Sequence, residues 1–194
     1  MQTFLTETIE GVKGTFTPCV EDFDVAEIPL YEPIGSGEHL YISLRKRELT
    51  TRQVVRRAVE VFGVEERNVG YAGLKDKNAT TVQTISVHGI DVDQAQRLAN
   101  DNLEVLSATH HKNKLRVGHL AGNRFRVRIR NTDASGLANA QSALSMIAKE
   151  GLPNFYGRQR FGRDGDNADR AREVLKRGRR VAGSKWKMKF LISA

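Results

Sequence analysis

Apolar and polar residues alternate along several stretches of this chain, as they do in strands that bury one face. The alternation is clear in Phe23–Ile28, where apolar and acidic residues take turns, and in Phe125–Arg130, where arginines separate apolar residues. A further strand is expected before Gly14, so that residues 1–33 form a strand-turn-strand unit. Altogether the pattern predicts strands at 23–28, 40–45, 80–87, 103–108, 114–117 and 125–130.

Helical spacing appears in two longer stretches. Thr50 or Thr51 is placed to cap a helix that runs to Phe62, with apolar residues on one face and Gly63 as its stop. A second helix is predicted from about 131 to 151, and shorter ones at 91–99 and 167–177. Strands outnumber helices, so we expect an α+β fold with a mixed, mainly antiparallel sheet and helices packed on it.

The composition indicates a soluble globular protein, with 39% hydrophobic and 28% charged residues. No apolar run approaches the ~20 residues that span a bilayer. The single cysteine, Cys19, excludes an intramolecular disulfide and is typical of a reducing cytoplasm, where we expect the protein to be. No metal site is predicted, because the five histidines are scattered: His39, His88, His110, His111 and His119.

The net charge of +8 is concentrated in one segment. Between Arg158 and Lys189 there are twelve basic and four acidic residues, and charges cancel in the rest of the chain. Such a stripe is typical of a surface that binds a polyanion, most simply nucleic acid. The alternative is a solvated helix face that binds nothing.

The stretch Gly70–Val87 carries the candidate chemistry. It sets Asp76 between Lys75 and Lys77, on a glycine-containing loop that leads into a β-rich run. Neighbouring cations favour an ionised carboxylate, which a nucleophile or an electrostatic stabiliser needs. The same residues are also ordinary turn chemistry, so a solvated surface turn is the alternative.

This stretch resembles the signature of the TruD family of tRNA pseudouridine synthases, Ala-Gly-x-Lys-Asp-[Lys/Arg]-x-Ala-x-Thr-x-Gln. The matching positions are Ala72, Gly73, Lys75, Asp76, Lys77, Ala79, Thr81 and Gln83. In that family the aspartate of the motif is the catalytic nucleophile, so the resemblance assigns this role to Asp76.

Further segments resemble the same family in the same order. Glu21, Asp22, Phe23, Val25 and Glu27 match its first motif, but Thr17 and Val20 replace a lysine and a proline. The missing lysine would lie near the catalytic carboxylate, so either another cation compensates or this copy is impaired. Residues 110–125 match a block whose Asn-x-Phe pair, here Asn123 and Phe125, reaches the active site. Residues 151–162 match a block that contains Arg158 and Arg160.

The resemblance implies isomerisation of a tRNA uridine to pseudouridine, at position 13 in family members, without a cofactor or metal. Phe125 would then stack on the uracil, and Asn123 would either hydrogen-bond the uracil or hold Asp76. Lys75, Lys77, Arg158 and Arg160 would contact phosphates. Residues 1–156 would form the first part of a catalytic domain, and residues 157–194 the start of a family-specific inserted domain. We therefore expect a fragment with an exposed sheet edge and little turnover alone, and a monomer when complete.

Two other classes of function stay open at this stage. One is a catalytically inactive RNA-binding module, which Thr17 and the apparent truncation favour. The other is a carboxylate-dependent hydrolase, such as a glycosidase or nuclease. That class needs a second carboxylate or a metal-binding acid cluster, and no partner for Asp76 is evident from spacing.

Overall fold

The computed structural model describes residues 5–152, together with residues 169, 172, 173 and 176. The chain divides into two compact units, of which the larger comprises residues 10–140. The smaller gathers residues 1–9 and 141–194. Everything that follows on the sheet and the candidate site concerns the larger unit.

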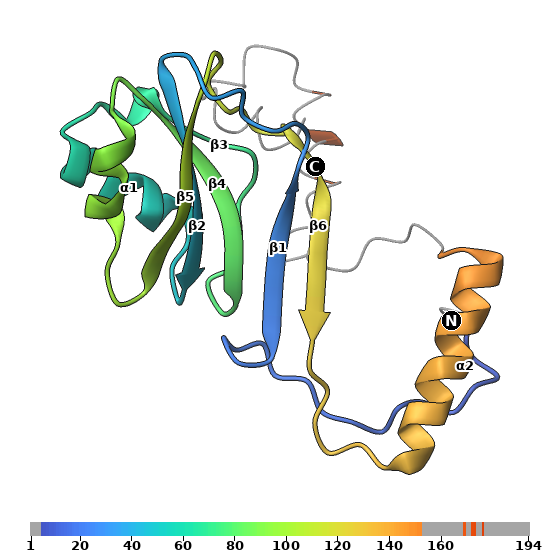
Figure 1. Ribbon diagram of the computed structural model, residues 1–194. Helices are drawn as coiled ribbons and strands as arrows, with labels where there is room; N and C mark the ends of the chain where they lie inside the picture. The colour runs from blue at the N-terminus through green and yellow to red at the C-terminus, as the bar shows by residue number, and fades with distance from the viewer. Residues whose placement is uncertain (1–4, 153–168, 170–171, 174–175, 177–194) are drawn as a thin grey trace. The chain divides into compact units, whose positions relative to one another are not determined.

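A six-stranded mixed sheet forms the centre of the larger unit (Figure 1). Five strands follow the order β5-β2-β4-β1-β6, and the sixth, β3, pairs with β4 beside this path. Only β1 and β4 pair in parallel, and every other pairing is antiparallel. The predicted α+β class with a mainly antiparallel sheet is therefore confirmed. The strands are β1 (Phe23–Pro29), β2 (His39–Arg47), β3 (Val69–Tyr71), β4 (Thr80–His88), β5 (Leu103–His111) and β6 (Leu120–Val127).

Helix α1 (Thr51–Phe62) covers the β5-β2-β4 side of the sheet (Figure 1). It begins with a capping box, in which Thr50 and Gln53 satisfy each other's backbone N–H groups, and it ends at Gly63 in the left-handed conformation. Its buried residues Val54, Val55 and Ala58 pack against the alternate apolar residues of β2. The helix predicted for 51–62 is thus confirmed, and it leaves β1 and β6 uncovered by α1.

Strand β4 shares one of its edges between two partners. Val69–Tyr71 pairs with its C-terminal half, and β1 pairs in parallel with residues 80–82 at its N-terminal end. The loop of residues 72–79 therefore leaves the sheet where β3 ends and re-enters it next to β1. This loop contains Asp76.

Gly70 was predicted to lie in a flexible loop, yet it is the central residue of β3. A methyl group on Gly70 would collide with the carbonyl oxygen of Leu115 and with Oγ of Ser86, so the strand requires glycine there. Glycine in this strand therefore reflects close approach of a second backbone, which a local sequence pattern does not reveal.

Replacing Gly70 by alanine is expected to lower the free energy of unfolding by about 1–3 kcal/mol, because the added methyl group overpacks the site. Gly122→Ala is the matched control, since Gly122 also lies in a strand but has open space around its Cα. Urea unfolding of both variants measures the difference. Equal stability of the two variants would contradict the assigned close packing.

Several other predicted strands differ from the structure. The strand before Gly14 is absent from residues 5–13, and near it only Thr15 bridges to Arg130. The segment 114–117 is irregular, and it buries Leu115 against Tyr41 and Ala72. Burial of Leu115, and not a ladder of hydrogen bonds, thus anchors this segment, whereas its other apolar residue, Val117, is exposed.

Tertiary pairing also moves two strand boundaries. β5 continues through the polar residues 109–111 because β2 pairs with it as far as His39 and His111. β6 begins at Leu120 and ends at Val127, whereas the alternation alone predicted 125–130. Its phase is as expected, with Phe125 and Val127 on one face.

Helix α2 spans Ala134–Glu150, as the helical spacing predicted. The carboxylate of Asp133 accepts a hydrogen bond from the backbone N–H of Gly136 at 2.8 Å and thereby caps the first turn. Gly151 follows in the left-handed conformation. Among the helices that the structure describes, none is long and apolar enough to cross a membrane.

Most of the predicted basic segment, 157–194, lies outside the described residues, and so do Arg158 and Arg160. Their predicted roles stay predictions. The same holds for the domain boundary that the sequence placed at residue 156.

Candidate active site

Asp76 lies on the loop of residues 72–79 with its side chain exposed to solvent. The loop is short and enters β4 directly, with Ala79 fully buried at its end. Three sets of contacts hold the backbone on either side of Asp76. Each set comes from a different part of the sheet or from α1.

The first contact comes from Lys46, the penultimate residue of β2. Lys46 is fully buried, and its Nζ donates hydrogen bonds to the main-chain carbonyl oxygens of Asp76, at 2.8 Å, and of Leu49, at 2.5 Å. Burial lowers the pKa of Lys46 to about 8, while the carboxylate of Asp76 acts to raise it and the charge of Lys75 to lower it further.

The second contact comes from the N-terminus of α1. The backbone N–H of Lys75 donates to Oγ1 of Thr51 at 2.9 Å, and this hydroxyl donates in turn to Oε1 of Gln83 at 3.0 Å. Both Thr51 and Gln83 are buried. The relay therefore connects the loop to α1 and to β4 through groups that have no access to water.

The third contact is made by the side chain of Lys75. Its Nζ lies 3.1 Å from Oε2 of Glu27 in β1 and 2.7 Å from Oδ1 of Asn123 in β6, residues that face each other across the two strands. Only 5% of the Lys75 side chain and 4% of the Glu27 side chain are exposed. Burial raises the pKa of Glu27 above its usual value, and the charge of Lys75 opposes this shift.

Phe125 occupies the uncovered part of the same sheet face. Lys46, Thr81, Val25 and Phe125 are direct partners on successive strands, so their side chains share one face of the sheet. The ring of Phe125 is 59% exposed and stacks on Phe23, with centroids 6.2 Å apart and planes within 7°. An exposed ring that is fixed by a second ring is suited to stack on a base.

The buried carboxylate of Asp22, just before β1, binds the side chain of Arg130, which follows β6. Asp22 is 5% exposed and accepts two hydrogen bonds from the guanidinium of Arg130, at 2.5 and 2.7 Å. This pair lowers the pKa of Asp22. The bidentate geometry fixes the start of β1 against the chain just after β6, three residues before Val25, which pairs with Phe125.

The structure thus brings Asp76, Lys75 and Asn123 together around one loop, with Phe125 on the same sheet face. Lys77 is exposed on the loop. Four residues of this site were not predicted to belong to it: Lys46, Thr51, Gln83 and Glu27. Thr51 was expected only as a possible helix cap, and Gln83 and Glu27 lie in matched motifs. A signal existed for Lys46, because it continues the alternation Leu40, Ile42, Leu44 of core-facing residues and is therefore a lysine at a core position.

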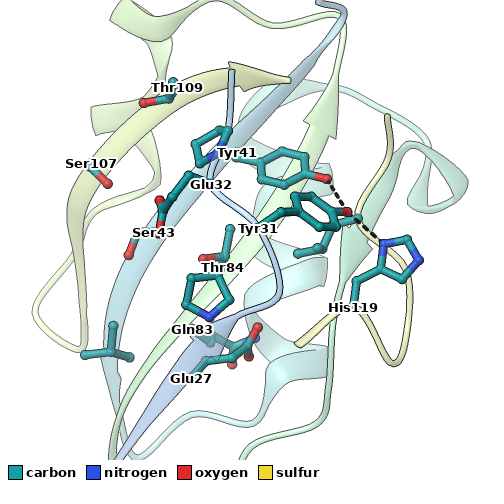
Figure 2. Close-up of a pocket in the computed structure, with 14 residues that line it drawn as sticks. Glu27, Tyr31, Glu32, Tyr41, Ser43, Gln83, Thr84, Ser107, Thr109 and His119 are labelled. Atoms are coloured by element: carbon teal, nitrogen blue, oxygen red, sulfur yellow. Dashed lines mark hydrogen bonds between the residues drawn. The ribbon is translucent and has the colours of Figure 1, made fainter. Parts of the chain in front are cut away.

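A pocket lies largely on the opposite face of the sheet, where Tyr41, Ser43 and Thr84 point (Figure 2). The hydroxyl of Tyr31 lies 2.8 Å from Nδ1 of His119 and 3.3 Å from the hydroxyl of Tyr41. Glu27 also lines this pocket. The lining contains carboxylates but no lysine or arginine, so its charge does not suit a phosphate.

The site combines an exposed carboxylate, that of Asp76, with an exposed aromatic ring, that of Phe125. Within the described part of the chain, no group of histidine, cysteine, aspartate or glutamate has the arrangement of a metal site. The exposed carboxylate of Asp76 is free to approach a ligand, because the hydrogen bond from Lys46 uses its main-chain oxygen and leaves the carboxylate unused. An exposed carboxylate on a loop that is held on both sides is chemically able to act as a nucleophile.

Sequence and structure comparisons relate this chain to known proteins. A curated relative from Geotalea daltonii, named tRNA pseudouridine synthase D, is 46% identical over 167 residues, which are 86% of this chain and 42% of that protein. A relative of the same name from Thermus thermophilus is 44% identical over 192 residues, covering 98% of this chain and 53% of that protein. The chain therefore spans about half of the length of these relatives.

A crystal structure described as a tRNA pseudouridine synthase D from Methanosarcina mazei superimposes with a TM-score of 0.74 and 31% identity, over 82% of this chain and 38% of that one. The family model for tRNA pseudouridine synthase D matches residues 1–179. On these grounds the chain belongs to the TruD family of tRNA pseudouridine synthases.

Proposed function

We propose that this chain carries the nucleophile-bearing part of an enzyme that isomerises a uridine in tRNA to pseudouridine. The observation that carries the proposal is the presentation of Asp76, whose backbone is held on both sides while its carboxylate stays exposed. A fixed backbone with an open carboxylate is what an attacking group needs, because positioning removes much of the entropic cost of the reaction.

The reaction exchanges one bond to the sugar for another. The bond between N1 and C1′ breaks, with Asp76 either attacking C1′ or assisting the departure of uracil. The uracil then rotates and a bond forms between C5 and C1′; where Asp76 has attacked C1′, the bond between its carboxylate and C1′ breaks in this step and the carboxylate is regenerated. The proton on C5 is released and N1 takes up a proton. Atoms and electrons balance within the nucleoside, so the reaction itself requires no external oxidant or reductant.

Base access is the second requirement, because a stacked uridine hides its glycosidic bond from a side chain. Extruding the nucleotide costs a few kcal/mol. Stacking on Phe125 would return roughly 1–3 kcal/mol of that cost. The exposure of the ring and its fixed orientation on Phe23 support this role.

The polar residues around the loop divide into two proposed roles. Lys77 is exposed and is the described lysine best placed to contact a phosphate. Lys75 was predicted to do the same, but its ammonium group is buried between Glu27 and Asn123, which favours a role in positioning the loop. Asn123 accepts a hydrogen bond from Lys75, and its amide nitrogen stays available for the uracil. Arg158 and Arg160 are proposed to bind tRNA on motif grounds alone.

Tritium release tests this function. Unmodified tRNA with tritium on C5 of uridine is incubated with this chain, and with a completed protein in which the chain is fused to the remaining part of the Thermus thermophilus relative. We expect tritium release without strand cleavage from the completed protein and little turnover from the chain alone. Binding without release would identify an RNA-binding module. Cleavage of the strand would identify a nuclease, and release of free uracil a glycosidase.

A further inference from the structure

Lys46 is a buried cation that the proposed chemistry does not use directly. Lys46 has no exposed surface, and within the described residues it forms no ion pair with a carboxylate. Its two acceptors are both main-chain carbonyl oxygens, those of Leu49 and Asp76. A buried ammonium without an ion-pair partner is costly, so its retention needs an explanation.

We propose that Lys46 is a positioning residue for Asp76: its ammonium fixes the backbone of the loop and places a positive charge beside the attacking carboxylate. This inference rests on the proposed function. Leu49 belongs to the turn that leads from β2 to α1, whereas Asp76 belongs to the loop between β3 and β4. The ammonium therefore joins this turn to the loop of Asp76, close to the hydrogen bond by which Lys75 joins the same loop to Thr51.

Charge is the feature that separates this role from simple packing. An uncharged side chain of similar length would fill the same space, but it would not attract the carboxylate of Asp76. Two charged groups act on Lys46 from the packed loop, Asp76 with an attractive effect and Lys75 with a repulsive one. Because the pKa of Lys46 is lowered to about 8, its charge is lost just above neutral pH.

The test uses Lys46→Met, Lys46→Gln and Lys46→Arg, with Lys114→Met as the matched control. Lys114 also donates from Nζ to a main-chain carbonyl, that of Arg67, but it takes no part in the loop of Asp76. Amide hydrogen exchange of residues 72–79 is measured in the chain itself. Turnover is measured by tritium release between pH 6 and 9.5, in the chain alone or in the completed fusion protein, whichever is active.

We expect Lys46→Met and Lys46→Gln to speed exchange in residues 72–79 at least tenfold and to lower kcat at least 100-fold with little change in KM. We expect the rate of the parent to fall near pH 8, as Lys46 loses its proton. Lys46→Arg should keep turnover within about tenfold and should not show this fall, because arginine stays charged. If the neutral variants do not fold, the pH profiles of the parent and of Lys46→Arg decide the question.

Unchanged exchange in the neutral variants, unchanged kcat, or the same pH limb in the parent and in Lys46→Arg would each overturn the proposal. A completed protein without turnover would count against the proposed function instead. In that case the exchange of residues 72–79 still decides whether Lys46 holds the loop.

Discussion

Asp76→Asn is expected to abolish pseudouridine formation, with kcat lowered at least about 1,000-fold, because removal of a nucleophile removes the step that it performs. The substitution keeps size and shape, and the main-chain oxygen that Lys46 contacts is unchanged. Affinity for tRNA should therefore change by no more than about threefold. Tritium release and a tRNA-binding titration on the completed protein measure the two effects.

Asp101→Asn provides the control, since Asp101 is an exposed aspartate in the turn before β5. Activity of Asp76→Asn within tenfold of the parent would refute the assignment. The variant has a second use, because Asp76 acts to raise the pKa of Lys46. Removal of the carboxylate should lower the pKa of Lys46 below about 8, which an NMR titration of its side chain would detect.

The sequence predicted the class of fold and the main elements because their signals are local. Alternation identifies β1, β2 and β4, and the capping box and left-handed Gly63 identify α1. The motif at residues 72–83 placed Asp76 on a loop at the start of a strand, and the structure has it there. These features depend on neighbours in the chain, which a single sequence displays.

The contacts around Asp76 were not predictable in the same way, because their partners lie far apart in sequence. Lys75 meets Glu27 and Asn123 only because β1 pairs with β6 and the loop crosses them. Lys46 interrupts an apolar series on the buried face of β2, and an alternation pattern treats such a residue as an exception. In both cases the informative fact is a charged side chain without solvent, which only the packed structure reveals.

The buried Lys75–Glu27 pair leads to the second large effect. Lys75→Met should lower the free energy of unfolding at pH 7.5 by about 3–5 kcal/mol, because it leaves the carboxylate of Glu27 buried without its cation. Burial already raises the pKa of Glu27, and loss of Lys75 removes the effect that opposes this shift. Lys77→Met is the control, since Lys77 is exposed on the other side of Asp76. Urea unfolding measures both variants.

The stability of Lys75→Met is also expected to change with pH in a definite direction. In Lys75→Met the folded state binds a proton on Glu27 at a higher pH than the unfolded state, whose pKa is near 4.5. Stability therefore rises as the pH falls from 7.5 toward 4.5, relative to the parent. For the same reason the double variant Glu27→Gln/Lys75→Met should recover most of the lost stability at pH 7.5, because no buried charge is left unpaired. A loss that neither acid nor Glu27→Gln relieves would mean that Lys75 stabilises the site by packing or through Asn123, and that Glu27 is not its essential partner.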